Sequence, residues 1–135
     1  MKLFLLSVFL TACALQAEDL IVIAHPGVKA SEISADDIKL VFLGSKTALS
    51  DGSPVTPVLA KDGAVHEAFL KSYVGKSDAA LRNHYKSLVF TGKGSMPKTL
   101  DSDAAIAAYV ASNKGAIGYV AASASTGGAK KLGIK

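Results

Sequence analysis

The strongest constraint on the fold is the alternation of short apolar runs with longer segments of helical periodicity. The runs DLIVIA (19–24), VTPVL (55–59) and AIGYV (116–120) are rich in β-branched residues and nearly free of charge. Such runs are typical of short, buried strands. Because segments with apolar residues at helical spacing separate them, the order predicts a compact α/β domain with a small mixed sheet flanked by helices.

Capping residues mark where the helices begin and end. Ser34, Ser77 and Ser102 each precede a helical pattern and are followed by acidic residues, which favour a helix start. Gly44 and Gly75 stand where two of the helical patterns stop. We therefore expect four helices, which begin after Ser34, span 65–74, and begin after Ser77 and after Ser102. Residues 90–97 are expected to form a loop, and 132–134 a further strand.

The stretch AKDGAVHEAF (60–69) joins the second apolar run to the second helix. A turn at a helix start leaves backbone N–H groups free, and these groups and the helix dipole both favour an anion. The alternative is an ordinary strand-to-helix turn with no ligand. As an anion site it would use backbone N–H groups for geometry, and the side chains of Lys61 and His66 for charge. Its candidate residues are Lys61, Asp62, Gly63, Ala64, Val65 and His66.

The first residues have the pattern of a secretory signal. Met1-Lys2 is followed by an apolar run from Leu3 to Ala12, which is too short to span a bilayer as a helix. Cleavage after residue 17 would leave residues 18–135 as a single exported domain in the periplasm. Alternatively, LTAC resembles a lipobox, so that residues 1–12 are removed and Cys13 is lipidated and anchors the protein to the envelope. Since Cys13 is the only cysteine, no disulfide is expected.

Several functional classes are disfavoured by the sequence. The net charge of +4 is spread along the chain without aromatic–basic interleaving, which argues against nucleic acid as a partner. The three histidines are isolated from one another, so no metal site is expected. No serine occupies a G-x-S-x-G turn, and no other nucleophile–base pair stands out. We therefore expect neither an enzyme nor a cofactor.

Three segments resemble the substrate-binding proteins of phosphate ABC transporters. DIKLVFLG (37–44) with Asp51-Gly52 resembles the helix and loop "I-F-L-G-K … W-x-D-G" of that family. KDGAVHEAF (61–69) resembles the turn and helix that carry its phosphate ligands, and GAIGYV (115–120) resembles its "G-A-I-G-Y-V" strand. The resemblance covers most of residues 20–122 and is closest to short, single-domain relatives. It implies a single lobe of the periplasmic-binding-protein type.

The phosphate turn departs from the family pattern Arg-x-Asp-Gly-Ser-Gly-Thr. Ala60 stands in place of the Arg, Ala64 of the Ser, Val65 of the Gly and His66 of the Thr, and only Asp62-Gly63 remains. Each missing side-chain contact is worth roughly 1–3 kcal/mol. The resemblance therefore implies an anion site that has lost most of its side-chain ligands.

Two hypotheses follow from the resemblance and its departures. The first is a solute-binding protein for phosphate or another small inorganic oxyanion, which would serve an ABC permease or a sensor protein. The second is a non-transport periplasmic interaction or sensory module built on the same lobe, with the anion site lost. A homodimer that rebuilds a cleft fits either hypothesis.

Overall fold

The structure, a computed structural model, describes residues 19–135. The expected signal segment, Cys13 and Glu18 lie outside the described residues. Within residues 19–135, none of the helices is both long and apolar enough to cross a membrane. The elements are β1 (Leu20–Ala24), β2 (Glu32–Ile33), α1 (Ala35–Phe42), β3 (Thr56–Ala60), α2 (Ala64–Phe69), η1 (Leu70–Val74), α3 (Asp78–Phe90), β4 (Lys98–Leu100), α4 (Asp103–Ser112), β5 (Ala116–Ala121) and β6 (Lys130–Ile134).

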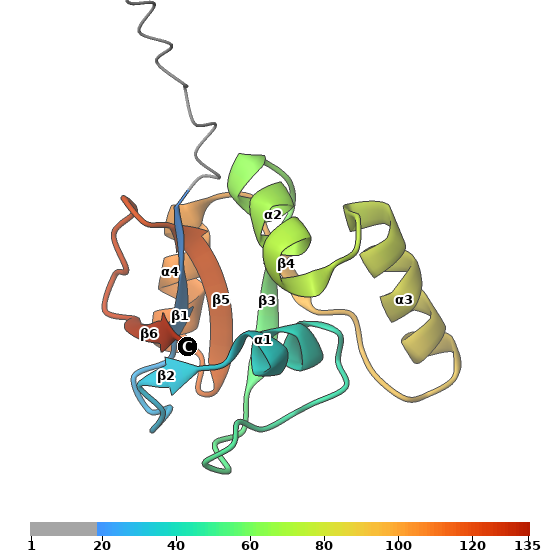
Figure 1. Cartoon of the computed structure of the whole chain (residues 1–135), viewed down its shortest axis with the longest axis horizontal. Helices are drawn as coiled ribbons and strands as arrows, with labels where there is room; N and C mark the ends of the chain where they lie inside the picture. Colours follow the sequence, from blue (N-terminus) through green and yellow to red (C-terminus); the bar gives the residue numbers. More distant parts are fainter. Residues whose placement is uncertain (1–18) are drawn as a thin grey trace, which may run out of the picture.

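The strands form one six-stranded mixed sheet in the order β2-β6-β1-β5-β3-β4 (Figure 1). The central strand β1 is antiparallel to both of its neighbours, β5 and β6. Strand β3 is parallel to β5 on one side and to β4 on the other. The predicted α/β domain with a small mixed sheet is therefore confirmed.

Helices cover both faces of the sheet, as successive residues of β5 show. Gly118 faces α4, because a Cβ added to it would lie 3.0 Å from Ile106 Cγ2. Tyr119 points to the opposite face, as alternation along a strand requires, and stacks on Phe69 of α2 with ring centroids 3.8 Å apart. Phe42 of α1 packs edge-on against both aromatic rings. The main aromatic core thus lies between the sheet, α1 and α2.

Local capping chemistry explains where three of the helices begin. The hydroxyls of Ser34, Ser77 and Ser102 each accept a hydrogen bond from a backbone N–H three residues on, at 3.1–3.2 Å. The predicted caps and all four predicted helices are present. The second helix begins without a side-chain cap and continues through 70–74 as π-helical turns.

Two short strands differ from the sequence prediction. Strand β2 has two residues and β4 has three, and both were absent from the expected elements. Helix α3 runs to Phe90, so the expected loop begins one residue later than predicted. Strands this short carry no periodicity of their own, and they form because β6 and β3 offer free edges.

Candidate functional site

The turn between β3 and α2 is open at its surface. Gly63, the residue before α2, has φ 103°, a conformation that favours glycine. Apart from the two adjacent residues, no part of the described chain lies within 4 Å of where a Cβ on Gly63 would be, so the space above Gly63 is free. Asp62 and Ala64 are exposed on either side of Gly63. The turn can therefore admit a small ligand to its backbone.

The backbone N–H groups of this turn are the donors that such a ligand would meet. Within the described chain, no acceptor is found for the N–H groups of Asp62, Gly63, Ala64, Val65 and His66. The next N–H along the chain, that of Glu67, donates to the Gly63 carbonyl and begins the helical pattern. Free N–H groups at a helix start attract anions. The turn thus supplies backbone donors, and none of residues 60–66 carries a side-chain hydroxyl or guanidinium of its own.

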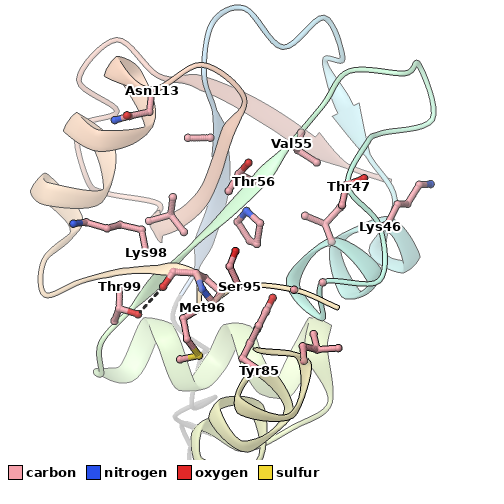
Figure 2. A pocket seen from close by; sticks show the side chains of 18 of the residues that line it. Lys46, Thr47, Val55, Thr56, Tyr85, Ser95, Met96, Lys98, Thr99 and Asn113 are labelled. Atoms are coloured by element: carbon pink, nitrogen blue, oxygen red, sulfur yellow. Dashed lines mark hydrogen bonds between the residues drawn. The ribbon is translucent and has the colours of Figure 1, made fainter. Parts of the chain in front are cut away.

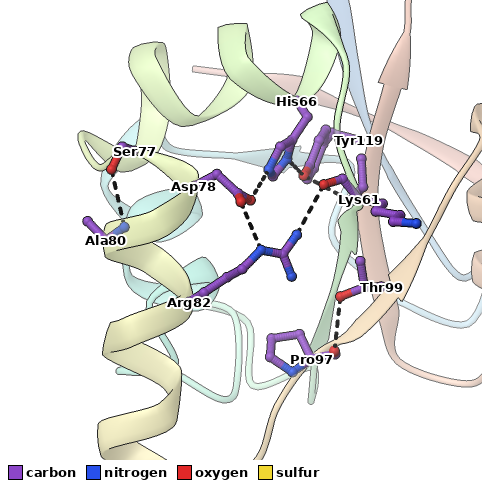
Figure 3. Close-up of polar contacts among 10 residues, drawn as sticks. Lys61, His66, Ser77, Asp78, Ala80, Arg82, Pro97, Thr99 and Tyr119 are labelled. Atoms are coloured by element: carbon purple, nitrogen blue, oxygen red, sulfur yellow. Dashed lines mark hydrogen bonds and ion pairs between the residues drawn. The ribbon is translucent and has the colours of Figure 1, made fainter.

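His66 lies beneath the turn rather than in it. Its side chain is 1% exposed, the one polar residue among the buried residues of 19–135. Its Nδ1 lies 2.5 Å from the Tyr119 hydroxyl, and its Nε2 lies 2.7 Å from Asp78 Oδ1 (Figure 3). Because both ring nitrogens are already bonded, the expected role of His66 as a cation for an anion is not favoured by its position.

The partners of His66 determine which ring nitrogen carries the proton. The Ala60 N–H donates to the Tyr119 oxygen at 3.0 Å, which leaves the Tyr119 hydroxyl free to donate to His66 Nδ1. His66 Nε2–H then donates to the Asp78 carboxylate. Burial raises the pKa of the Tyr119 hydroxyl, so it keeps its proton and remains a donor. In this arrangement the Tyr119 hydroxyl and both ring nitrogens of His66 have hydrogen-bond partners.

Arg82 completes the network and ties α3 to the turn. Its Nε donates to Asp78 Oδ2 at 2.8 Å, and its Nη2 donates to the Lys61 carbonyl at 3.1 Å (Figure 3). The hydrogen bond from Arg82 lowers the pKa of the Asp78 carboxyl; burial opposes this shift, and His66 adds to it. Asp78 is therefore an anion at neutral pH, held between His66 and Arg82. We call Ala60, His66, Asp78, Arg82 and Tyr119 the turn-supporting network.

The structure separates the six candidate residues into two groups. Lys61 through Ala64 are exposed and Val65 is half-buried, so their backbone borders the open turn. His66 belongs to the turn-supporting network. The side chain of Lys61 extends to the side of β3 opposite to Arg82 (Figure 3). No ligand is present to test these residues, and their role in binding stays a prediction.

Sequence reasoning missed the other members of the network. Asp78 and Arg82 stand four residues apart on α3, a spacing that allows an ion pair on a helix. That spacing could have indicated the pair, but nothing local connects it with His66 or Tyr119. Within residues 19–135, no three side chains of His, Cys, Asp or Glu come together as metal ligands.

Comparisons with known proteins bear on the fold. No protein-family model matches the sequence, and no curated protein matches it. Among solved structures, the chain is similar to a phosphate-bound protein from Clostridium perfringens that is assigned to the phosphate ABC transporter substrate-binding proteins. The TM-score is 0.66 and the identity 20%, over 86% of this chain and 44% of that one.

Two further solved structures show the same likeness. An ABC-type phosphate transport receptor from Vibrio cholerae gives a TM-score of 0.61 at 11% identity, over 86% of this chain and 46% of that one. PstS from Borrelia burgdorferi gives a TM-score of 0.65 at 10% identity, over 87% of this chain and 47% of that one. The chain spans less than half the length of each of these proteins. At these identities the likeness shows the fold, which is that of a single lobe of the phosphate-binding type.

Proposed function

We propose that this chain, which has the fold of one lobe of phosphate-binding proteins, is a binding protein that holds phosphate or another small oxyanion weakly at the β3–α2 turn. The observation that carries the proposal is the run of free backbone N–H groups from Asp62 to His66 at an open turn. The turn-supporting network lies beneath the turn and holds the backbone that carries these N–H groups in place. Such a protein acts by binding rather than by catalysis, and an ABC permease or a sensor would be its partner.

Weak affinity follows from the side chains around the turn. Ala60 and Ala64 carry no donor, and Lys61 extends away from Arg82 along the other side of β3. An anion at this turn would remain in contact with water, where salt screens its interaction with exposed charges. We therefore expect a dissociation constant on the order of millimolar, which corresponds to about −4 kcal/mol.

One variant removes a single backbone donor of the turn and keeps the helix. Proline is tolerated at the first helical position, where its missing N–H costs no helical hydrogen bond. Ala64→Pro places it at the first residue of α2, and Ala35→Pro is the matched control at the first residue of α1. In titrations with sulfate and phosphate at constant ionic strength, followed by amide NMR, we expect Ala64→Pro to weaken binding about fivefold. Ala35→Pro should bind as the wild type does.

The titrations also decide between the two hypotheses. If the wild type binds neither anion at millimolar concentration, the turn is structural only. The interaction or sensory module then becomes the better account. The feature that favours it is an exposed apolar surface at the end of α3, where Phe90 is 92% exposed and Val89 46%. Apolar side chains that are exposed next to one another contribute to the kind of surface through which proteins contact other proteins.

Export is part of the same proposal. The apolar run of residues 3–12 and the change to polar residues at Glu18-Asp19 support it. Intact mass of the protein recovered from the cell envelope is expected to correspond to a start at Glu18, or at a lipidated Cys13. Recovery from the cytosol with Met1 to Ala17 retained would contradict it.

A further inference from the structure

An open cavity of about 880 Å³ lies at the other end of β3 from the turn. Its walls come from α1 and the loop after it, the first half of β3, α3, the loop that joins α3 to β4, β4, and the end of α4 with the turn that follows it (Figure 2). None of residues 60–66 lines it, so it is separate from the candidate oxyanion site. Its volume falls within the range of about 300–1,000 Å³ that is common for small-molecule sites.

All the charged residues that line this cavity are lysines. Lys46, Lys93, Lys98 and Lys114 contribute to its walls, and no Asp or Glu does. Lys46 forms an ion pair with Asp37 at 2.7 Å, whereas the other three have no carboxylate partner within residues 19–135. The ammonium of Lys98 lies 5.9 Å from the centre of the Tyr109 ring. A concave site with charges of one sign concentrates ions of the opposite sign.

Two hydroxyl groups add hydrogen-bonding capacity inside the cavity. The side chains of Thr56 and Ser95 lie in the middle of the cavity, whereas those of Lys98 and Lys46 extend outward on opposite sides of it (Figure 2). Neither hydroxyl has a hydrogen-bond partner in the part of the chain that the structure describes. Each can therefore donate to an oxygen of a ligand.

The remaining walls are apolar. Val55 and Val58 form a buried floor, at 5% and 1% exposure, and Met96 stands at the rim with 45% of its surface exposed. Apolar walls stabilise a bound inorganic ion little, because they contribute to binding by burying apolar surface of the ligand. They suit a ligand that brings an apolar body together with its charge.

We propose that this cavity binds an organic anion, with a carboxylate, sulfonate or phosphate monoester near Lys98 and Lys114 and an apolar body over Val58 and Met96. Lys93 adds a third positive charge from the loop. This site is independent of the proposed oxyanion turn, and the two can be tested separately.

The test uses 8-anilinonaphthalene-1-sulfonate, an aromatic sulfonate whose fluorescence rises in an apolar site. We expect the paired substitution Lys98→Gln with Lys114→Gln to weaken its binding about tenfold. The control is Lys71→Gln with Lys76→Gln, which removes two exposed lysines that do not line the cavity. It should bind the dye as the wild type does. Thermal unfolding of each variant verifies that the fold is retained, and Lys93→Gln with Lys114→Gln serves if the first pair unfolds.

Competition defines the class of ligand. Hexyl phosphate is expected to displace the dye at lower concentration than inorganic phosphate does, because only the former has an apolar body. Ala64→Pro should leave dye binding unchanged, so that failure of this proposal and failure of the oxyanion proposal give different results. Equal loss of dye binding in the cavity pair and in the control pair, or no binding by the wild type, would overturn the proposal. Equal displacement by the two phosphates would overturn the apolar part of it.

Discussion

Replacing His66 by alanine is expected to lower the free energy of unfolding by about 3 kcal/mol at neutral pH. The substitution removes a side chain that is 1% exposed and leaves a void beneath α2. It also leaves the Tyr119 hydroxyl without its acceptor and Asp78 without one of its two donors. When a buried polar group loses its partner, the free energy of unfolding falls by more than the net contribution of the lost hydrogen bond. Denaturant unfolding followed by circular dichroism measures the change.

Two conservative variants divide this effect between the two hydrogen bonds. His66→Asn can keep an acceptor for the Tyr119 hydroxyl, whereas His66→Gln can keep a donor for Asp78. Each is expected to be less destabilising than alanine. His66→Ala unfolding at the same denaturant concentration as the wild type would contradict the turn-supporting network.

The turn-supporting network determines which residues of the pattern Arg-x-Asp-Gly-Ser-Gly-Thr can be introduced at this turn without loss of stability. Where the related pattern has a Thr, this chain has His66, whose ring joins β5 to α3 through Tyr119 and Asp78. His66→Thr is too short to make both contacts and is expected to behave like His66→Ala. A variant designed to strengthen phosphate binding should therefore change Ala60 or Ala64 and retain His66.

Gly118→Val is expected to destabilise the protein by about 3 kcal/mol. A Cβ at Gly118 would lie 3.0 Å from Ile106 Cγ2 and 3.3 Å from Val110 Cγ2, both on α4. Ile106 and Val110 are fully buried, so they have no free space to move into. The expected result is a lower denaturation midpoint with an unchanged slope, measured by the same unfolding experiment.

A control and a rescue make this second prediction specific. Gly133→Ala in β6 meets its nearest atom, Glu32 Cγ, at an ordinary 3.5 Å and should cost little. Ile106→Ala is destabilising by itself, but combined with Gly118→Val it should cost less than the sum of the two changes. Simple additivity of the two changes would contradict the close approach of β5 to α4.

Much of the fold was predictable because its determinants are local. The apolar runs at 19–24 and 116–120 predicted β1 and β5, and Ser34, Ser77 and Ser102 predicted three helix starts. These patterns depend on neighbours within a few residues, which the sequence shows directly. Strands β2 and β4 were missed because they exist only through pairing with β6 and β3.

The candidate site was predictable only in part. The Gly-containing turn and its helix could be located from AKDGAVHEAF, as could the absence of the family's Arg, Ser and Thr. The orientation of His66 could not, because its partner Tyr119 is 53 residues away and Asp78 is 12 residues away. The sequence therefore presented His66 as a surface cation, whereas the structure places it in the core.

The sequence by itself thus determined the four longer strands, the helix starts and the position of the Gly-containing turn, since strand burial patterns, caps and glycine conformations act over a few residues. Only the tertiary structure decided that His66 faces inward and that Lys93, Lys98 and Lys114 share one cavity. The physical reason is that burial and charge clustering depend on which distant segments the core brings together. The packing of α2 and α4 against β5, and of α1 against β3, fixes those neighbours, and no short stretch of sequence contains that information.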